Sequence, residues 1–213
     1  MGGVALAILV NSSTNEAVKN KWATRWECFY DATYLFKHCT GKDFVIDVAA
    51  EPQTAKVERF YLSPNWVSEQ KGDYSALGSN IVLPNAKPIG FDGLQCYWED
   101  GWWCNPPFDL KLRFIRKARE EVKKGREGMM LIPYEPLSGW WRDEVDGYAT
   151  MVFEPNGRYP FYEADGYTKK SGVNFGSVLV LFTARALSTP RTTFKRNIYQ
   201  DNSPKLMQFI DVC

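Results

Sequence analysis

Short apolar runs typical of buried strands alternate with helical patterns from residue 101 onward, and this alternation constrains the fold more than any other feature. The expected elements are strands at 101–104, 128–133, 149–153 and 177–183 and helices at 109–124 and 138–145. Strands that alternate with helices build a mostly parallel sheet with helices on both faces. The last two strands are expected to form an antiparallel edge. The sequence therefore predicts an α/β fold.

The N-terminal part of the chain adds one helix and one strand. Residues 26–36 place apolar side chains at helical spacing, and this helix is expected to end near Gly41. Residues 44–50 predict a buried strand that carries Asp47 toward its C-terminal end. Ligands of α/β proteins bind beyond the carboxyl ends of the strands, so Asp47 is a candidate site residue. The alternative is a carboxylate that only caps the next helix.

The length of 213 residues favours one domain over residues 1–213. Residues 1–21 are expected to form an N-terminal extension. Its apolar run at 4–10 is too short to span a membrane, which needs roughly 20 residues, and is interpreted as a strand or as a leader that packs on the domain. Residues 63–90 are rich in Pro, Gly, Ser and Asn and predict a long loop or an insertion. We therefore expect one domain and no membrane anchor.

Composition excludes several kinds of site. His38 is the only histidine, which rules out sites built from two or three imidazoles, and its position favours a helix-end residue over a catalytic one. The five cysteines are odd in number and lack C-x-x-C spacing, which argues against a zinc ribbon or a disulfide scaffold. With 26 basic and 25 acidic side chains, a polyanion would have to meet a local basic patch.

The tetrapeptide Asn105-Pro106-Pro107-Phe108 joins a predicted strand to a predicted helix. Its prolines fix φ at roughly −65° and keep the preceding residues extended, so the loop is stiff. Asn105 offers a side-chain carbonyl, Pro106 a backbone carbonyl and Phe108 a ring face. Two acceptors beside a flat ring suit an exocyclic amine, because they favour the pyramidal nitrogen whose lone pair can attack. A base in a duplex would have to be flipped out, or already be single-stranded, to reach this loop.

This tetrapeptide looks like the [D/N/S]-P-P-[Y/F/W] signature of amino-group methyltransferases, and its surroundings resemble the phage-type Dam-like DNA N6-adenine methyltransferases. The similar blocks are W-A-T at 22–24, F-V-I-D-V-A-A-E-P-Q-T-A-K at 44–56, F-D-G-L at 91–94, W-W-C-N-P-P-F at 102–108, G-M-M-L-I-P at 128–133, G-R-Y-P-F at 157–161 and N-F-G-S-V-L-V-L-F at 174–182. They occur in the family's order and extend over most of the chain.

The resemblance implies a Rossmann-like class I methyltransferase fold, S-adenosylmethionine as cofactor, DNA as partner, adenine N6 as acceptor and no metal. It makes Asn105, Pro106, Pro107 and Phe108 the catalytic loop. The residues that it assigns to the cofactor are Trp22, Thr24, Asp47, Ala49, Ala50 and Asp92. A carboxylate such as Asp47 suits a donor with cationic sulfonium and ammonium groups. Asp92 either contacts the donor adenine or the substrate, or only starts a turn.

Two departures from the family pattern keep other functions open. Arg25 stands where the family usually has proline, and the F-x-G-x-G loop of other adenine methyltransferases is absent. One alternative is a catalytically silent nucleic-acid-binding module of the same fold. A second alternative has another basis: because the loop recognises an amine and not a whole base, the acceptor could be cytosine N4, RNA or a protein glutamine amide.

Basic and aromatic residues outside these blocks suggest where a nucleic acid would bind. Arg191, Lys195 and Arg196 are candidates for phosphate contact, whereas the basic face of the helix at 109–124 is expected to be a solvated surface. Trp102 and Trp103 are expected to pack on alternate faces of their strand. Of the pair at 140–141, one tryptophan is expected to be exposed and is a candidate to line the substrate cleft. A DNA substrate implies an intracellular protein, cytoplasmic in a phage or bacterial host and nuclear in a eukaryote.

Overall fold

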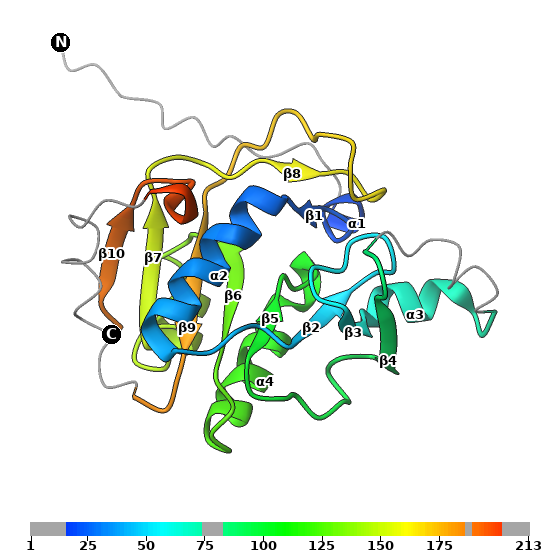
Figure 1. Cartoon of the computed structure of the whole chain (residues 1–213), viewed down its shortest axis with the longest axis horizontal. Coiled ribbons are helices and arrows are strands. Elements are labelled where there is room, and N and C mark those ends of the chain that lie inside the picture. The colour runs from blue at the N-terminus through cyan, green and yellow to red at the C-terminus, as the bar shows by residue number, and fades with distance from the viewer. Residues whose placement is uncertain (1–15, 74–82, 186–188, 202–213) are drawn as a thin grey trace, which may run out of the picture.

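A sheet of eight strands forms the centre of the molecule (Figure 1). The computed structural model describes residues 16–73, 83–185 and 189–201. The strands of the sheet are β2 Ile46–Ala50, β3 Arg59–Leu62, β4 Lys87–Phe91, β5 Trp102–Cys104, β6 Gly128–Pro133, β7 Met151–Pro155, β9 Ser177–Phe182 and β10 Arg191–Phe194. Their order across the sheet is β10-β7-β9-β6-β5-β2-β3-β4.

Six of these strands follow the order of the doubly wound α/β fold. Strands β2 to β7, taken in chain order, occupy the arrangement 3-2-1-4-5-6 and run parallel to one another. Strand β9 is inserted between β6 and β7 and is antiparallel to both, whereas β10 continues the sheet parallel to β7. The expected Rossmann-like, mostly parallel sheet is confirmed, and the two strands predicted last pair antiparallel, as β7 and β9.

Helices cover both faces of the sheet. Helix α2, Trp26–Thr40, packs on one face, and α4, Lys111–Val122, packs with α5, Gly139–Glu144, on the other. Strand β5 contributes to both layers. Trp103 is fully buried on the α2 side, and Trp102 is fully buried on the α4 side. The prediction that these two tryptophans face opposite ways is confirmed.

Shorter elements complete the described fold. They are α1 Glu16–Lys19, β1 Ala23–Thr24, α3 Pro64–Gln70, the 3-10 turns η2 Phe108–Leu110 and η3 Ile198–Gln200, and β8 Phe161–Tyr162. Strands β1 and β8 pair antiparallel as a separate two-stranded sheet. This small sheet fixes the N-terminal segment against the loops near the carboxyl ends of β2 and β5 (Figure 1).

Part of the segment predicted as a long loop, 63–90, is regular structure. Ser63 accepts a hydrogen bond from the Trp66 N–H, Pro64 occupies the first helical position, and Trp66 is buried. Serine as N-cap followed by proline is a helix start, so residues counted as loop formers actually begin α3. The prediction of a long loop was wrong at α3 and at the start of β4, whereas the alternative, an insertion, stays a prediction.

The other predicted elements agree with the structure within two residues at each boundary, whereas the strands β1, β3, β8 and β10 were not predicted. Helix α2 ends as expected, because Gly41 has φ 75° and donates its N–H to the Lys37 carbonyl at 2.8 Å. His38 is exposed in the last turn and stacks on Tyr34, as a helix-end residue would. The strand predicted at 4–10 lies outside the described residues.

Candidate active site

The pairing of β2 with β5 brings the two parts of the candidate site together. The strands are parallel neighbours, and Asp47 is in register with Trp103. Asn105 directly follows β5, so it lies at the same edge of the sheet as the end of β2. After β2 the sheet extends to one side, through β3, and after β5 to the other, through β6. This is the switch point at which α/β folds bind their ligands.

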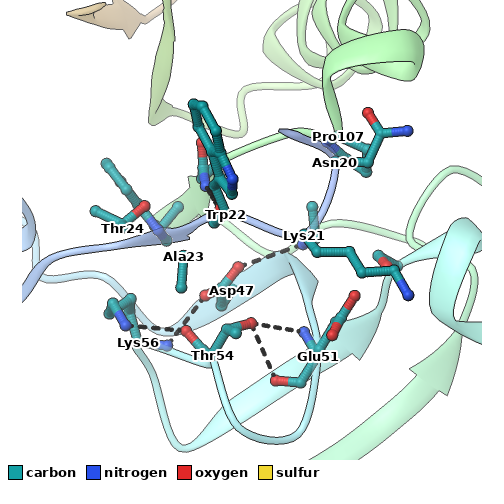
Figure 2. A pocket seen from close by; sticks show the side chains of 14 residues that line it. Asn20, Lys21, Trp22, Ala23, Thr24, Asp47, Glu51, Thr54, Lys56 and Pro107 are labelled. Atoms are coloured by element: carbon teal, nitrogen blue, oxygen red, sulfur yellow. Dashed lines mark hydrogen bonds between the residues drawn. The ribbon is translucent and has the colours of Figure 1, made fainter. Parts of the chain in front are cut away.

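A cavity of about 30 Å³ lies at this switch point (Figure 2). It has room for one or two water molecules. Its lining residues are Asn20, Lys21, Trp22, Ala23, Thr24, Asp47, Ala49, Glu51, Thr54, Lys56, Ser63, Trp103, Asn105 and Pro107. The site residues that were predicted from sequence and line this cavity are Trp22, Thr24, Asp47, Ala49, Asn105 and Pro107. The fold therefore gathers residues from three separate sequence blocks.

The loop of residues 105–108 presents a polar and an aromatic group on a stiff backbone. Pro106 and Pro107 are buried, whereas Asn105 and Phe108 are half-buried. Asn105 Nδ2 donates a hydrogen bond to the backbone carbonyl of Trp22 at 3.2 Å. Because a carbonyl can only accept, this contact fixes which way the amide points. The Asn105 Oδ1 atom accepts no hydrogen bond from the described residues and is left as an acceptor beside the cavity.

An aromatic cluster holds Trp22 over the cavity. Its ring stacks on Phe175 with an interplanar angle of 4° and centroids 6.0 Å apart, and it lies 6.0 Å from Phe161. Phe108 meets Phe175 and Trp22 edge to face, at 5.0 and 6.5 Å. Each aromatic pair at such a separation stabilises the fold by roughly 0.5–1.5 kcal/mol more than the burial of its surface alone. The blocks at 22–24, 102–108, 157–161 and 174–182 therefore meet at one point.

Asp47 is buried, with 3% of its surface exposed. Its carboxylate accepts the backbone N–H groups of Lys56 at 3.1 Å and Ala49 at 3.3 Å. Burial raises the pKa of Asp47 to about 6, although these hydrogen bonds and the nearby Lys56 ammonium favour the charged form. The side chain thus ties β2 to the following loop and also faces the cavity.

The loop between β2 and β3, residues 51–58, supplies site residues that the sequence analysis missed. Parallel strands are usually joined through a helix, but here a short turn closed by Glu51 and Thr54 makes the connection. Glu51, Thr54 and Lys56 consequently point into the cavity (Figure 2). Burial raises the pKa of Glu51 to about 7 and lowers the pKa of Lys56 to about 8. The sequence did contain a signal for these site residues, because charged side chains directly follow the apolar strand within the block at 44–56.

Three buried polar atoms at the cavity have no hydrogen-bond partner in the described part of the chain. They are Trp22 Nε1, Thr24 Oγ1 and Trp103 Nε1. Buried polar groups are normally paired, and each unpaired group costs roughly 1–3 kcal/mol. Two indole N–H donors and a hydroxyl fit a ligand that carries hydrogen-bond acceptors. Together with Asp47, which suits cationic groups, these residues fit the mixed charges of a sulfonium amino acid such as S-adenosylmethionine.

Four predicted site residues do not line the cavity. Pro106 and Phe108 are not among the residues that line the cavity, and Phe108 packs on Trp22 and Phe175 instead. Ala50 belongs to the core beneath α3. Asp92 follows β4 with φ 55°, and its carboxylate accepts the Leu94 N–H at 3.0 Å as in a turn. The next residue, Gly93, packs so closely on β2 that a Cβ atom would lie 1.9 Å from the Val48 carbonyl. The F-D-G-L block thus has a packing role at the sheet.

In a comparison with protein families, residues 71–207 match the family described as DNA N-6-adenine-methyltransferase (Dam). The matched part is more than half of the chain and contains Asn105–Phe108. The chain belongs to the Dam family. Its reaction is S-adenosylmethionine-dependent methylation of adenine N6 in DNA. The segment before residue 71, which carries Trp22, Thr24 and Asp47, lies outside the match to the Dam family.

Solved structures similar to this Dam-family chain are distant. One is from Listeria monocytogenes and is assigned as a class I S-adenosylmethionine-dependent methyltransferase, with 11% identity over 91% of this chain and 71% of that one and a TM-score of 0.49. Another is from Agrobacterium tumefaciens and is assigned as an O-methyltransferase, with 12% identity over 93% and 96% and a TM-score of 0.38. A search of curated protein sequences gave no match.

The basic residues expected to contact DNA lie at two edges of the Dam-family fold. Lys195 and Arg196 follow the end of β10, which runs in the same direction as β5, so they lie on the edge that carries Asn105. Lys195 is exposed, and Arg196 donates to the Arg158 carbonyl at 2.6 Å. Arg191 begins β10 at the opposite edge and pairs with Asp146 at 2.9 Å. The fold therefore separates Arg191 from the cavity edge.

The basic face of α4 is largely neutralised within the protein. Arg116 and Arg119 each pair with Glu144 at 2.5 Å, and Lys117 pairs with Glu121 at 2.8 Å. Of the tryptophans on α5, Trp141 is fully buried, and the half-buried Trp140 has the Lys111 ammonium 5.4 Å from its ring centre. These pairs agree with the expectation that the α4 face is a solvated surface and not a site of phosphate contact.

Two further observations concern the described ranges 16–73, 83–185 and 189–201. No three His, Cys, Asp or Glu side chains in them are grouped as metal ligands would be. Within the same ranges, no helix has the length and apolar character needed to cross a membrane.

Proposed function

We propose that the cavity between β2 and β5 receives the methionine part of S-adenosylmethionine and that the loop 105–108 receives the adenine amino group. One observation carries this proposal. The Trp22 carbonyl engages the amide nitrogen of Asn105, which leaves Oδ1 as an acceptor at the cavity. The whole described chain would act as a single methyltransferase domain, because one continuous sheet supports both parts of the site.

The residues of the loop would act on the amino group by position and hydrogen bonding. Asn105 Oδ1 and the Pro106 carbonyl would accept its two N–H bonds, and Phe108 would stack on the base. Bound S-adenosylmethionine supplies an electrophilic methyl group. Held by two acceptors, the nitrogen would become pyramidal, and its lone pair would become available for attack. The loop would thus contribute to catalysis through positioning and electrostatic stabilisation. A base in a duplex would have to be flipped out to reach these groups.

The segment 20–24 would have to move when the donor binds. A cavity of about 30 Å³ is far too small for an adenosyl group, and Asn20 to Thr24 cover it. Two contacts hold this cover at the loop: Asn105 Nδ2 to the Trp22 carbonyl and the Asp109 N–H to Asn20 Oδ1, at 3.2 and 3.1 Å. We expect the donor to replace or shift these contacts while it satisfies the unpaired groups of Trp22, Thr24 and Trp103.

DNA would lie along the edge that carries the ends of β5 and β10. Lys195 and Arg196 are the candidates for phosphate contact on this edge, and Arg191 has less support because of its ion pair at the opposite edge. DNA as substrate would also place the protein inside a cell.

The test of this proposal is the variant Asn105→Ala in an assay with labelled donor and DNA, followed by nucleoside analysis. We expect label on N6-methyladenine with the unchanged protein. Loss of one preorganised hydrogen-bond partner should lower kcat by roughly 100-fold or more. The affinity for the donor, measured by calorimetry, should change by less than about threefold.

The matched control is Gln95→Ala, which removes an exposed side-chain amide after β4, outside the cavity. It should keep the turnover of the unchanged protein. If Asn105→Ala retains full turnover while folded, or if the label appears on cytosine, the proposed role of the loop is wrong.

A further inference from the structure

Groups that donate hydrogen bonds gather at one end of the cavity. In Figure 2, Thr24 and Lys56 lie on one side of Asp47, and Lys21 and Glu51 lie on the other. Thr24 Oγ1 and Trp103 Nε1, which both line the cavity, are buried and unpaired among the described residues. An acceptor with more than one oxygen would satisfy several of these groups at once.

Lys56 is the cationic group at this end. It is 5% exposed, donates to the Thr54 carbonyl at 3.0 Å, and lies 4.6 Å from the centre of the Trp26 ring. Within the described ranges, its ammonium group forms no ion pair. Asp47 acts on this ammonium group electrostatically but forms no direct ion pair with it, so the buried charge is only partly compensated and its three N–H donors are not all used. Such a group is typical of a binding site for an anion.

The second lysine of the cavity, Lys21, differs from Lys56 both in its exposure and in having an ion pair. Lys21 pairs with Glu69 at 2.8 Å, and its side chain is 38% exposed. Its charge is therefore compensated without a ligand. Two lysines face the same cavity, but only Lys56 is both buried and without an ion pair.

We infer that Lys56, with the Thr24 hydroxyl and the Trp103 indole, binds the carboxylate of the methionine part of the donor. This inference rests on the proposed donor cavity. The cavity then has two neighbouring subsites of opposite charge. Asp47 faces the cationic groups of the donor, and Lys56 faces its single anionic group. This arrangement also makes the donor's carboxylate, and not only its adenosine, a determinant of affinity.

The experiment compares two ligands that differ only in this carboxylate: S-adenosylmethionine and its decarboxylated analogue. Affinities are measured by calorimetry on the full chain. The variants are Lys56→Met, Lys56→Arg and Thr24→Val, with Lys37→Met as the control, because Lys37 is an exposed lysine of α2 that pairs with Asp43 and does not line the cavity. Thermal unfolding of each variant shows whether it is folded.

The unchanged protein should prefer S-adenosylmethionine by roughly 10- to 100-fold, the range expected for a charge-assisted hydrogen bond. Lys56→Met should bring this preference to within about threefold of unity by weakening only the binding of S-adenosylmethionine. Lys56→Arg should keep part of the preference, Thr24→Val should reduce it by roughly 2- to 10-fold, and Lys37→Met should leave it unchanged.

Three outcomes would overturn the inference. Equal losses for both ligands in Lys56→Met would show a purely structural lysine. No preference in the unchanged protein would show that the carboxylate is not bound here, although the donor cavity would stand. Binding of neither ligand by the unchanged protein would refute the donor cavity itself, and with it this assignment.

Discussion

Three ionisable residues of the cavity lower the stability of the folded protein when they are charged, because they are buried. Burial raises the pKa of Asp47 to about 6 and that of Glu51 to about 7, and it lowers the pKa of Lys56 to about 8. In each case the folded protein disfavours the charged form, so these charges do not stabilise the chain. Groups perturbed by burial and gathered in a cavity are typical of functional sites.

The stability of the protein should therefore fall as pH rises through the titration of Asp47. The unfolded chain releases this proton near pH 3.8 and the folded chain near pH 6, so the folded state binds more protons between these values. The contribution is fully present below pH 3.8 and is lost as pH rises through about 6. A shift of about two units corresponds to up to about 3 kcal/mol.

Urea unfolding of the unchanged protein and of Asp47→Ala from pH 4 to 7 measures this contribution. Glu51 changes in the same direction in both proteins, so the difference between the two curves isolates Asp47. Parallel curves would contradict the raised pKa. The variant should also bind the donor more weakly at pH 7.

At the level of elements, helix α4 is attached to the fold through buried charge. Glu121 has a side chain that is 1% exposed, and it pairs with Lys117, Lys124 and Arg126. These cations come from the helix itself and from the turn that leads to β6. Because breaking a buried pair leaves charges without compensation, this carboxylate matters more than any exposed ion pair on the same helix.

Replacing Glu121 by alanine should lower the free energy of unfolding by roughly 3–5 kcal/mol, since three cations would lose their buried partner. The neighbouring Glu120→Ala is the matched control. Glu120 is exposed and, among the described residues, its ion pair is with Lys123, so its loss should cost far less than the loss of Glu121. Denaturant titrations of both variants measure the difference. Equal losses would mean that the Glu121 cluster is no stronger than a surface pair.

At the scale of the whole molecule, one edge of the sheet carries the functional groups. The parallel direction of β2, β5 and β10 places Asp47, Asn105 and Lys195 toward the same edge. Arg191 starts β10 and lies at the other edge. A DNA strand bound at the cavity would therefore meet Lys195 and Arg196 but not Arg191.

This difference can be measured through the salt dependence of DNA binding. Lys195→Ala should weaken binding at low salt and reduce the slope of log K against log salt by about one, as expected for one lost phosphate contact. Arg191→Ala should leave the slope unchanged. Fluorescence anisotropy with a short duplex between 50 and 200 mM salt is a suitable measurement. If the slope changes more in Arg191→Ala than in Lys195→Ala, the DNA binds along the opposite edge.

Local patterns predicted much of the fold but not its irregular parts. Strands β6 and β9 and helix α2 follow from continuous apolar runs or helical spacing, which depend only on neighbouring residues. Helix α3 was missed because Ser63 and Pro64 are equally common in loops and at helix starts. Strand β10 was missed because its sequence, R-T-T-F, has too few apolar residues to signal a strand without its partner β7.

The sequence by itself determined the alternation of strands and helices, the stiffness of the loop at 105–108 and the family, because periodicity, proline geometry and ordered motifs are properties of the chain alone. Only the tertiary structure decided that Lys56, Trp103 and Thr24 share one cavity with Asn105. That convergence depends on the register of β2 with β5 and on the pairing of β1 with β8. Both join residues far apart in the chain, and no local pattern specifies such contacts.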